Sequence, residues 1–253
     1  VVDRALTAVT RAIREGVPGI VGIHLEGPFL ASSRRGIHDA AHFRTMDMTA
    51  VELLSRPTGG RTLVTLAPEC VPTEFITALV ERGVTVSLGH TDGTATKASY
   101  AFGAGATGVT HLFNAMSGIH HRDFGLALAA LTDDRVVFGL IADTHHVHPD
   151  AVALAFASRP DGVCLVSDSV AWRSQWALYA GVSVRDGVPV LADGTLAGSS
   201  TPLSECVRRA VTECRAGLPA ALRAATSTPA SVIDRSDVGT ISAGRICDIV
   251  AWD

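Results

Sequence analysis

Three residues of metal-binding types each stand at or near the end of an apolar, strand-like run. They are Glu26, His90 and His111. A carboxylate at the end of a buried strand must meet a cation, a metal ion or several hydrogen-bond donors. One carboxylate and two imidazoles with a fourth position open form a ligand set typical of a catalytic divalent-metal site, for which zinc is the default ion. If the three strands belong to one barrel, the sequence therefore predicts a metal centre.

Each of these residues also has a structural interpretation. Glu26 could form a salt bridge to Arg34 or Arg35 in the next loop, and a single histidine at a strand end is more often a core or capping residue. His24 lies on the same face of its strand as Glu26, since side chains alternate along a strand. For His24 a hydrogen-bonded core position is favoured over a ligand role.

Other polar residues stand near the ends of later apolar runs. Asp168 could cap the following segment, or it could act as a general base beside a metal-activated water. Residues 143–148 (DTHHVH) hold three histidines that a loop would point in different directions, so one substrate-facing histidine is favoured over a metal cluster. Arg122 is either a surface charge or an anion clamp for a phosphorylated substrate.

The elements that must position these residues alternate between strand and helix. Strands are predicted at residues 19–26, 61–67, 84–90, 107–113, 135–142 and 162–168. Helices are predicted at residues 72–82, 93–103, 123–131 and 149–158, with Pro72 and Pro149 at helix starts and Gly83 at a helix end. The alternation indicates parallel βα units. Because no Gly-rich phosphate loop follows the first strand, a (β/α)8 barrel with six of its eight strands in this chain is favoured over a doubly wound sheet.

The last third of the sequence has a different pattern. Residues 181–195 predict short hairpin strands, with turns at Asp186-Gly187 and Asp193-Gly194. Helices are expected at 202–215 and 219–226, and residues 239–253 are expected to form a small β segment.

Composition excludes several classes of protein. The chain has 253 residues, 47% hydrophobic and 18% charged, with a formal net charge of −4 and no Lys/Arg cluster, so a nucleic-acid partner is not expected. Its 5 cysteines form no CxxC pair, which fits a reducing cytoplasm better than a disulfide framework. No membrane span or signal peptide is predicted. The amphipathic pattern that begins at Val2 suggests that the sequence starts inside a domain.

Several segments together resemble a known enzyme family. HLEGPF (24–29), GHT (89–91), THLFNAM (110–116), LVSD (165–168) and LAGS (196–199) resemble, in order and spacing, the N-acetylglucosamine-6-phosphate deacetylases of the amidohydrolase superfamily. The resemblance extends to the closing segments ATSTPA and GTISAGRICDIVAWD. HLEGPF combined with THLFNAM is far more specific than any single histidine.

The resemblance implies a role for particular residues. Glu26, His90 and His111 would be the metal ligands, Asp168 the catalytic acid and base, and His38 the residue that helps to polarise the acetamide carbonyl. The implied substrate-binding positions are Ile37, His38, Asn114, Ala115, Arg122, Asp143, His146, Leu196, Ala197 and Gly198. The implied cofactor is a divalent ion, zinc by default, with iron, cobalt, manganese and cadmium as alternatives. A cytoplasmic homodimer is implied, in which Arg122 reaches the neighbouring subunit's site.

The implied reaction removes the acetyl group from N-acetyl-D-glucosamine 6-phosphate, an amino-sugar phosphate. Alternatives are a related amidohydrolase acting on N-acetylgalactosamine 6-phosphate and a catalytically silent sugar-phosphate-binding protein. The implied domains are a barrel over residues 1–238, incomplete at its N-terminus, and part of a small β-sandwich over residues 239–253. The sequence departs from the family pattern at 169–179 (SVAWRSQWALY) and at Pro202, both expected at the pocket rim.

Overall fold

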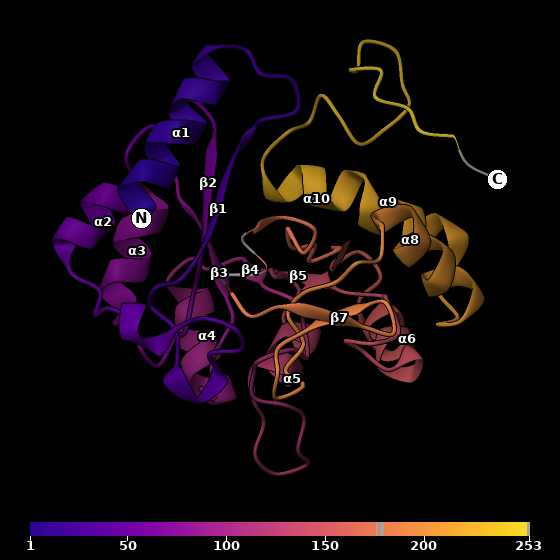
Figure 1. The fold of residues 1–253 in the computed structure, drawn as a ribbon, viewed down its shortest axis with the longest axis horizontal. Helices are drawn as coiled ribbons and strands as arrows, with labels where there is room; N and C mark the ends of the chain where they lie inside the picture. Colours follow the sequence, from indigo (N-terminus) through magenta and orange to yellow (C-terminus); the bar gives the residue numbers. More distant parts are fainter. Residues whose placement is uncertain (176, 178–179, 252–253) are drawn as a thin grey trace. The chain divides into compact units, whose positions relative to one another are not determined.

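Strands and helices alternate along the chain as the sequence predicts (Figure 1). The structure is a computed structural model that describes residues 1–175, 177 and 180–251. It divides into two compact units, Val1–Val136 and Val137–Asp253. Three strand pairs in the first unit and one in the second are parallel, as expected for strands joined by crossover helices.

The first unit carries four of the six βα strands. Its elements are α1 (Val2–Arg14), β1 (Gly22–Glu26), the 3-10 turns η1 (Ser32–Arg34) and η2 (Ala40–His42), α2 (Met48–Leu54), β2 (Arg61–Leu66), α3 (Thr73–Glu81), β3 (Thr85–Leu88), α4 (Ala95–Gly103), β4 (Gly108–Val109) and α5 (Leu126–Thr132). β1 pairs with β2, β2 with β3 and β3 with β4, so neighbours in sequence are neighbours in the sheet. The carboxyl ends of these strands therefore lie along one edge.

The proline and glycine predicted to bound a helix in this unit lie on either side of α3. Pro72 precedes α3 and Gly83, at φ +81°, follows it. Ile76 and Leu79 of α3 are fully buried, and α3 contacts β3. The second half of β2 is buried on both faces, because its consecutive residues Val64, Thr65 and Leu66 are all inaccessible to solvent, whereas β1 is only partly buried.

The second unit holds the remaining βα strands and a helical layer. Its elements are β5 (Val137–Leu140), α6 (Pro149–Ser158), β6 (Val163–Leu165), β7 (Ser183–Arg185), β8 (Val188–Val190), α8 (Leu203–Thr212), α9 (Leu218–Ala225) and α10 (Ser227–Val232). β5 and β6 are parallel, and α8, α9 and α10 all contact β6. β7 and β8 form the predicted antiparallel hairpin, with positive φ at Asp186 (+50°) and Gly187 (+81°), as a type I′ turn requires.

Three features differ from the sequence-based expectations. α2 and α10 were not predicted; each is a short helix with two buried side chains, too few for a clear period. The β segment expected in the tail is absent, since residues 239–251 contain no strand, and Trp252 and Asp253 lie outside the described residues. A strand needs a partner for its backbone N–H and C=O groups, and neither sheet of the described chain includes this segment.

Among the described residues, no helix combines the length and the apolar character needed to cross a bilayer. All five cysteines are free thiols. Within the divergent segment 169–179, Trp176, Leu178 and Tyr179 lie outside the described residues.

Candidate metal centre and substrate site

The first unit brings the three predicted metal ligands together. The Glu26 carboxylate, from the end of β1, lies 3.1 Å from His90 Nε2 and 3.0 Å from His111 Nε2. The two Nε2 atoms are themselves 3.1 Å apart. The rings of His90 and His111 are buried, whereas the Glu26 side chain keeps 28% of its surface exposed. One side of the cluster is thus open to a small molecule.

The backbone at both histidines is strained. His90 and His111 each stand two residues beyond a strand, at φ +47° and +35°. Non-glycine residues adopt positive φ rarely, and such outliers gather at functional sites. This left-handed turn directs both imidazoles toward the strand-end carboxylate of β1.

The loop that follows β1 fixes the orientation of His90. Its Nδ1–H donates to the Arg34 carbonyl oxygen at 2.8 Å, while the Ala31 N–H donates to the His90 carbonyl oxygen at 2.9 Å. The alternative interpretation was a salt bridge from Glu26 to Arg34 or Arg35. The Arg34 guanidinium instead pairs with Asp92 at 2.8 Å, so Arg34 does not provide that salt bridge. With Nδ1 as donor, a neutral His90 presents the lone pair of Nε2 to the cluster.

His38 is the fourth member of the cluster. It lies in the loop between η1 and η2, with Nε2 3.2 Å from the second Glu26 oxygen. Its ring meets that of His90 edge-on, with centroids 4.7 Å apart. Burial raises the pKa of Glu26, but hydrogen bonding to His111, His38 and His90 outweighs burial and holds that pKa well below its usual range. The carboxylate is therefore ionised.

These donors fit a divalent metal ion. An ionised carboxylate and the lone pair of His90 Nε2 repel one another at about 3 Å unless a cation or a proton lies between them. Zinc-ligand distances of about 2.0–2.2 Å place tetrahedral ligand atoms about 3.3–3.6 Å apart, slightly farther than the separations found here. The Glu26, His90 and His111 ligand atoms all lie within 4.8 Å of one another. Two imidazoles, one carboxylate and an open side match a catalytic ligand set.

His24 forms a hydrogen bond, as expected, but it is exposed and does not lie in the core. Its Nε2 lies 2.7 Å from Thr65 Oγ1, which is 2.7 Å from Thr110 Oγ1. A further 2.7 Å contact joins Thr110 to Ser87 Oγ. This chain of hydroxyl groups satisfies the polar side chains in the interior of the unit.

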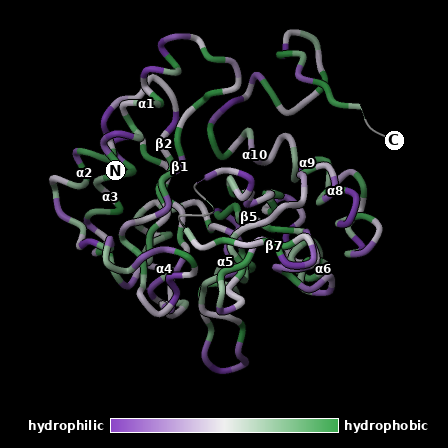
Figure 2. Tube along the Cα trace, in the orientation of Figure 1, coloured by the Kyte–Doolittle hydropathy of each residue, from purple (hydrophilic) through white to green (hydrophobic). Residues whose placement is uncertain are grey.

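The substrate residues predicted in the first unit fall into two groups. Asn114 and Ala115 follow His111 in the same turn, where Asn114 Nδ2 donates to the His111 carbonyl oxygen at 3.3 Å and Ala115 has φ +48°. Ile37 precedes His38 in its loop. Arg122 instead lies in the exposed loop 118–124, which connects β4 to α5 and whose purple tip projects beyond α5 (Figure 2). Arg122 lines a cavity of about 570 Å³ with Asp92 and Thr94.

In the second unit, Asp143 and His146 form a close pair. Asp143 stands three residues beyond β5 and is 1% exposed. Its Oδ2 lies 2.7 Å from His146 Nδ1. Burial raises the pKa of Asp143, but hydrogen bonds from the His146 ring, the His146 backbone and the His145 backbone outweigh burial and hold that pKa far below its usual range.

Asp168 lies next to the predicted segment 196–198. The Ser199 N–H donates to the Asp168 carbonyl oxygen at 2.9 Å, and Asp168 has φ +48°. Gly198, at φ +89°, permits this approach, because a Cβ there would stand 2.8 Å from the Asp168 carbonyl oxygen and 2.5 Å from Val170 Cγ1. Leu196 bridges to Val190 of β8, and Ala197 is fully buried.

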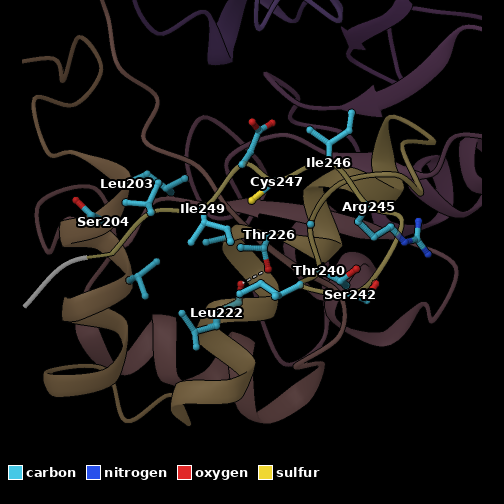
Figure 3. A pocket seen from close by; sticks show the side chains of 16 residues that line it. Leu203, Ser204, Leu222, Thr226, Thr240, Ser242, Arg245, Ile246, Cys247 and Ile249 are labelled. Carbon is cyan, nitrogen blue, oxygen red and sulfur yellow. Dashed lines mark hydrogen bonds between the residues drawn. The ribbon is translucent and has the colours of Figure 1, made fainter.

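A separate apolar cavity of about 720 Å³ lies in the second unit, between the tail and the helices α8 and α9 (Figure 3). Leu203 and Leu222 face Ile249 across it. None of the predicted site residues lines this cavity, so it is not the candidate site.

Comparison with known proteins agrees with this geometry. Residues 3–253 match the amidohydrolase family. The chain belongs to the amidohydrolase family. It is 39% identical over 259 aligned residues to the N-acetylgalactosamine-6-phosphate deacetylase of Shewanella sp. (strain ANA-3), covering 100% of this chain and 66% of that protein. It is 36% identical over 261 residues to human N-acetylglucosamine-6-phosphate deacetylase, covering 95% of this chain and 64% of that one.

Solved structures of amidohydrolases confirm the fold. The N-acetylglucosamine-6-phosphate deacetylase of Pasteurella multocida matches 96% of this chain, and 65% of its own, with a TM-score of 0.90 at 31% identity. A D267A mutant of the Mycobacterium smegmatis deacetylase, in complex with N-acetyl-D-glucosamine-6-phosphate, matches 96% of this chain and 67% of its own with a TM-score of 0.86 at 32% identity. The predicted (β/α)8 fold of amidohydrolase type is thereby confirmed, and the chain spans somewhat less than two thirds of the curated relatives just described.

Sequence reasoning missed several residues of this amidohydrolase site. The backbone carbonyl oxygen of Arg34 orients His90. Every residue has such an oxygen, so the residue type at position 34 gives no sign of this role. The Ser199 hydroxyl donates a hydrogen bond to the Asp143 carboxylate. Arg209 donates one from its guanidinium to the Asp143 carbonyl oxygen. The only available signal was that Ser199 directly follows the motif at 196–198.

Proposed function

We propose that this protein is a metal-dependent hydrolase that removes the acetyl group from N-acetyl-D-glucosamine 6-phosphate, giving glucosamine 6-phosphate and acetate. The observation that carries the proposal is the convergence of Glu26, His90 and His111 at one edge of a parallel sheet. Deacetylases of N-acetylated amino-sugar phosphates among the relatives support this substrate class. Metal-dependent amide hydrolysis is the chemistry that such a ligand set performs.

The proposed reaction divides the work among a few side chains. A divalent ion held by Glu26, His90 and His111 would supply Lewis-acid activation of water and of the amide carbonyl. Asp168 accepts a proton from the attacking water and passes it to the amine, so that acetate leaves. His38 donates a hydrogen bond toward the oxygen on which negative charge develops. The orientation of His90 by Arg34 keeps its Nε2 lone pair available throughout.

A second substrate is favoured by one observation. The Shewanella relative, at 39% identity, is named for N-acetylgalactosamine 6-phosphate, whereas the human relative at 36% is named for the gluco sugar. The two sugars differ only in the configuration at C4, so one active site could distinguish them by a single hydrogen bond. We retain the galacto sugar as the alternative substrate.

Acetate release from purified protein loaded with zinc tests the proposal. We expect turnover of N-acetylglucosamine 6-phosphate, slower turnover of the galacto isomer and little turnover of unphosphorylated N-acetylglucosamine. Faster turnover of the galacto isomer would assign the alternative substrate. If neither phosphate is hydrolysed and the protein binds both sugars without binding metal, the catalytically silent binding protein is the correct interpretation.

Zinc is the proposed ion, with iron, cobalt, manganese and cadmium as the alternatives that elemental analysis would identify. The sugar-phosphate contacts proposed are Ile37, His38, Asn114, Ala115, Arg122, His146 and the segment 196–198. We propose a cytoplasmic homodimer in which Arg122, on its exposed loop, reaches the neighbouring subunit's site; the five free thiols suit that compartment. The barrel over residues 1–238 and the β-sandwich portion over 239–253 remain the proposed domains.

A further inference from the structure

The carboxylate of Asp143 is saturated with hydrogen-bond donors. Its Oδ1 accepts from the backbone N–H groups of His145 at 2.9 Å and His146 at 2.8 Å. Its Oδ2 accepts from His146 Nδ1 at 2.7 Å and from Ser199 Oγ at 2.8 Å. A carboxylate has about four acceptor positions, and all are used here. Asp143 is therefore not free to contact a substrate, although the family resemblance places it among the substrate-binding residues.

The arrangement determines which nitrogen of His146 carries a proton. Because Asp143 Oδ2 can only accept, Nδ1 must be the protonated nitrogen, and Nε2 is left to face a ligand. The His146 side chain is 5% exposed, so few other ring orientations are available. The same carboxylate holds both the ring and the backbone N–H of His146, which ties the ring to the loop.

Arg209 of α8 holds the turn in which this pair lies. Its Nη1 donates to the Asp143 carbonyl oxygen and, at 3.1 Å, to Thr144 Oγ1. Thr144 has φ +64°, a conformation that is costly for a β-branched residue and needs support from its surroundings. Glu205 in turn accepts from Arg209 Nε at 2.9 Å. Hydrogen bonds from α8 thus hold the turn at Asp143 and Thr144 in place.

We propose that Asp143 is a positioning residue that, supported by Ser199 and Arg209, holds His146 with its proton on Nδ1 and presents Nε2 to the substrate. The substrate part rests on the proposed function, in which His146 contacts the sugar phosphate. The positioning part depends only on the contacts within residues 143–146, 199 and 209.

Asp143→Asn is the decisive variant. Two backbone N–H groups require the amide oxygen, so the amide NH2 must point at His146 Nδ1 and Ser199. Since an NH2 group only donates, the proton of a neutral His146 moves to Nε2. The Ser199 hydroxyl can reverse and accept, so the fold is preserved. Asp150→Asn, at an exposed aspartate paired with Arg215, is the matched control.

Imidazole ¹⁵N NMR at pH 8 reports the tautomer without substrate, and the His146 signals are assigned by their loss in His146→Gln. We expect a protonated Nδ1 in the parent and in Asp150→Asn, and a protonated Nε2 in Asp143→Asn. A protonated Nε2 in the parent would overturn the proposal even if the variant failed to fold. An unchanged tautomer in a folded Asp143→Asn would also overturn it.

Kinetics test the substrate part. We expect kcat/KM for the sugar phosphate to fall about tenfold or more in Asp143→Asn. Arg209→Gln should lower it several-fold, Arg209→Lys should partly restore it, and Arg208→Gln, on the neighbouring exposed arginine that also pairs with Glu205, should leave it unchanged. A reversed tautomer with parental kcat/KM would overturn the substrate part. A parent inactive on both sugar phosphates refutes the proposed function, whereas the NMR result still decides the positioning role.

Discussion

At the scale of single residues, three of the proposed metal-binding and catalytic residues have a strained backbone. His90, His111 and Asp168 have φ values of +47°, +35° and +48°, although none is glycine. Each conformation costs of the order of 1–3 kcal/mol and persists only where the surrounding structure enforces it. At His90 the hydrogen bonds to Ala31 and Arg34 provide that enforcement. The left-handed turn at His90 is therefore supported by contacts within the chain itself.

Replacing one imidazole should empty the metal centre. We expect the parent to hold about one divalent ion per chain and His111→Ala to hold well below one, because a carboxylate and a single imidazole make a weak site. Elemental analysis after gel filtration measures this. His121→Ala, in the exposed loop 118–124, is the control and should keep parental metal content. Unchanged metal in His111→Ala would mean that the ligand assignment is wrong.

Asp168 should be needed for turnover and dispensable for metal binding. Asp168→Asn keeps the shape of the side chain but removes the oxygen that accepts the water proton. We expect kcat to fall by about 10²-fold or more, the usual scale for losing a general base. Metal content and melting temperature should stay near those of the parent. A capping role predicts the reverse: a lower melting temperature with kcat within a few-fold of the parent.

The identities of these residues were predictable from the sequence, whereas their surroundings were not. Glu26, His90 and His111 were found because each ends a strand-like run, and parallel strands bring such ends to one edge. The contact of His90 with the Arg34 carbonyl oxygen and that of Ser199 with the Asp143 carboxylate each join residues 56 positions apart in the sequence. Periodicity carries no information about them.

At the scale of elements, the backbone of the loop after β8 closely approaches the backbone of the segment that follows β6. The segment 196–198 lies against Asp168 because Gly198 has no side chain. The same segment is connected to the hairpin β7–β8, since Leu196 bridges to Val190. The hairpin and its turns were predicted from Asp-Gly pairs, while this contact between the hairpin segment and Asp168 was not, because glycine alone does not reveal what approaches it.

A methyl group at residue 198 should separate these segments. Gly198→Ala introduces a Cβ 2.5 Å from Val170 Cγ1 and 2.8 Å from the Asp168 carbonyl oxygen. Gly194→Ala is the matched control, because Gly194 has nearly the same φ (+88°, against +89°) and open space around it. We expect the control to lose about 1 kcal/mol of unfolding free energy, and Gly198→Ala to lose at least about 1 kcal/mol more. Equal losses in urea denaturation would show that the contact is unimportant.

The β segment expected in the tail shows where element prediction fails. Residues 239–251 contain the apolar residues of a strand, and Ile241 and Val250 are 85% and 75% exposed. Strand propensity reflects packing on a partly buried surface, whereas these side chains border the open cavity beside α8 and α9. α2 and α10 were missed for the opposite reason, since their stability comes from packing rather than from a periodic pattern.

At the scale of the whole molecule, the candidate metal centre belongs to one of the two compact units. Glu26, His38, His90 and His111 all lie within Val1–Val136. A ligand that binds only the folded state stabilises it, by about 2.7 kcal/mol at a concentration one hundred times its dissociation constant. The added stability should be concentrated where the ligand binds.

Removing metal should lower the protection of backbone amides against hydrogen exchange most strongly in the first unit. We expect chelation to lower the melting temperature reversibly, with recovery on adding zinc. Hydrogen-exchange mass spectrometry should show the largest loss of protection in peptides covering residues 22–43 and 85–116, and a smaller loss in peptides of α8 and α9. A Glu26→Gln variant should show neither response. A uniform loss over both units would contradict a stabilisation confined to the metal-bearing unit.

The Asp186-Gly187 turn of the hairpin offers a place for a fluorescent reporter. The turn is exposed and has the backbone of a two-residue hairpin loop, the kind of site where added groups are tolerated. Its strand β8 is bridged to Leu196, and Ser200 donates a hydrogen bond to the Gly187 carbonyl oxygen. An environment-sensitive dye on residue 186 would therefore be joined by backbone contacts to the segment that lies against Asp168. Occupation of that segment by a sugar phosphate should then become visible as a change in emission, without any turnover.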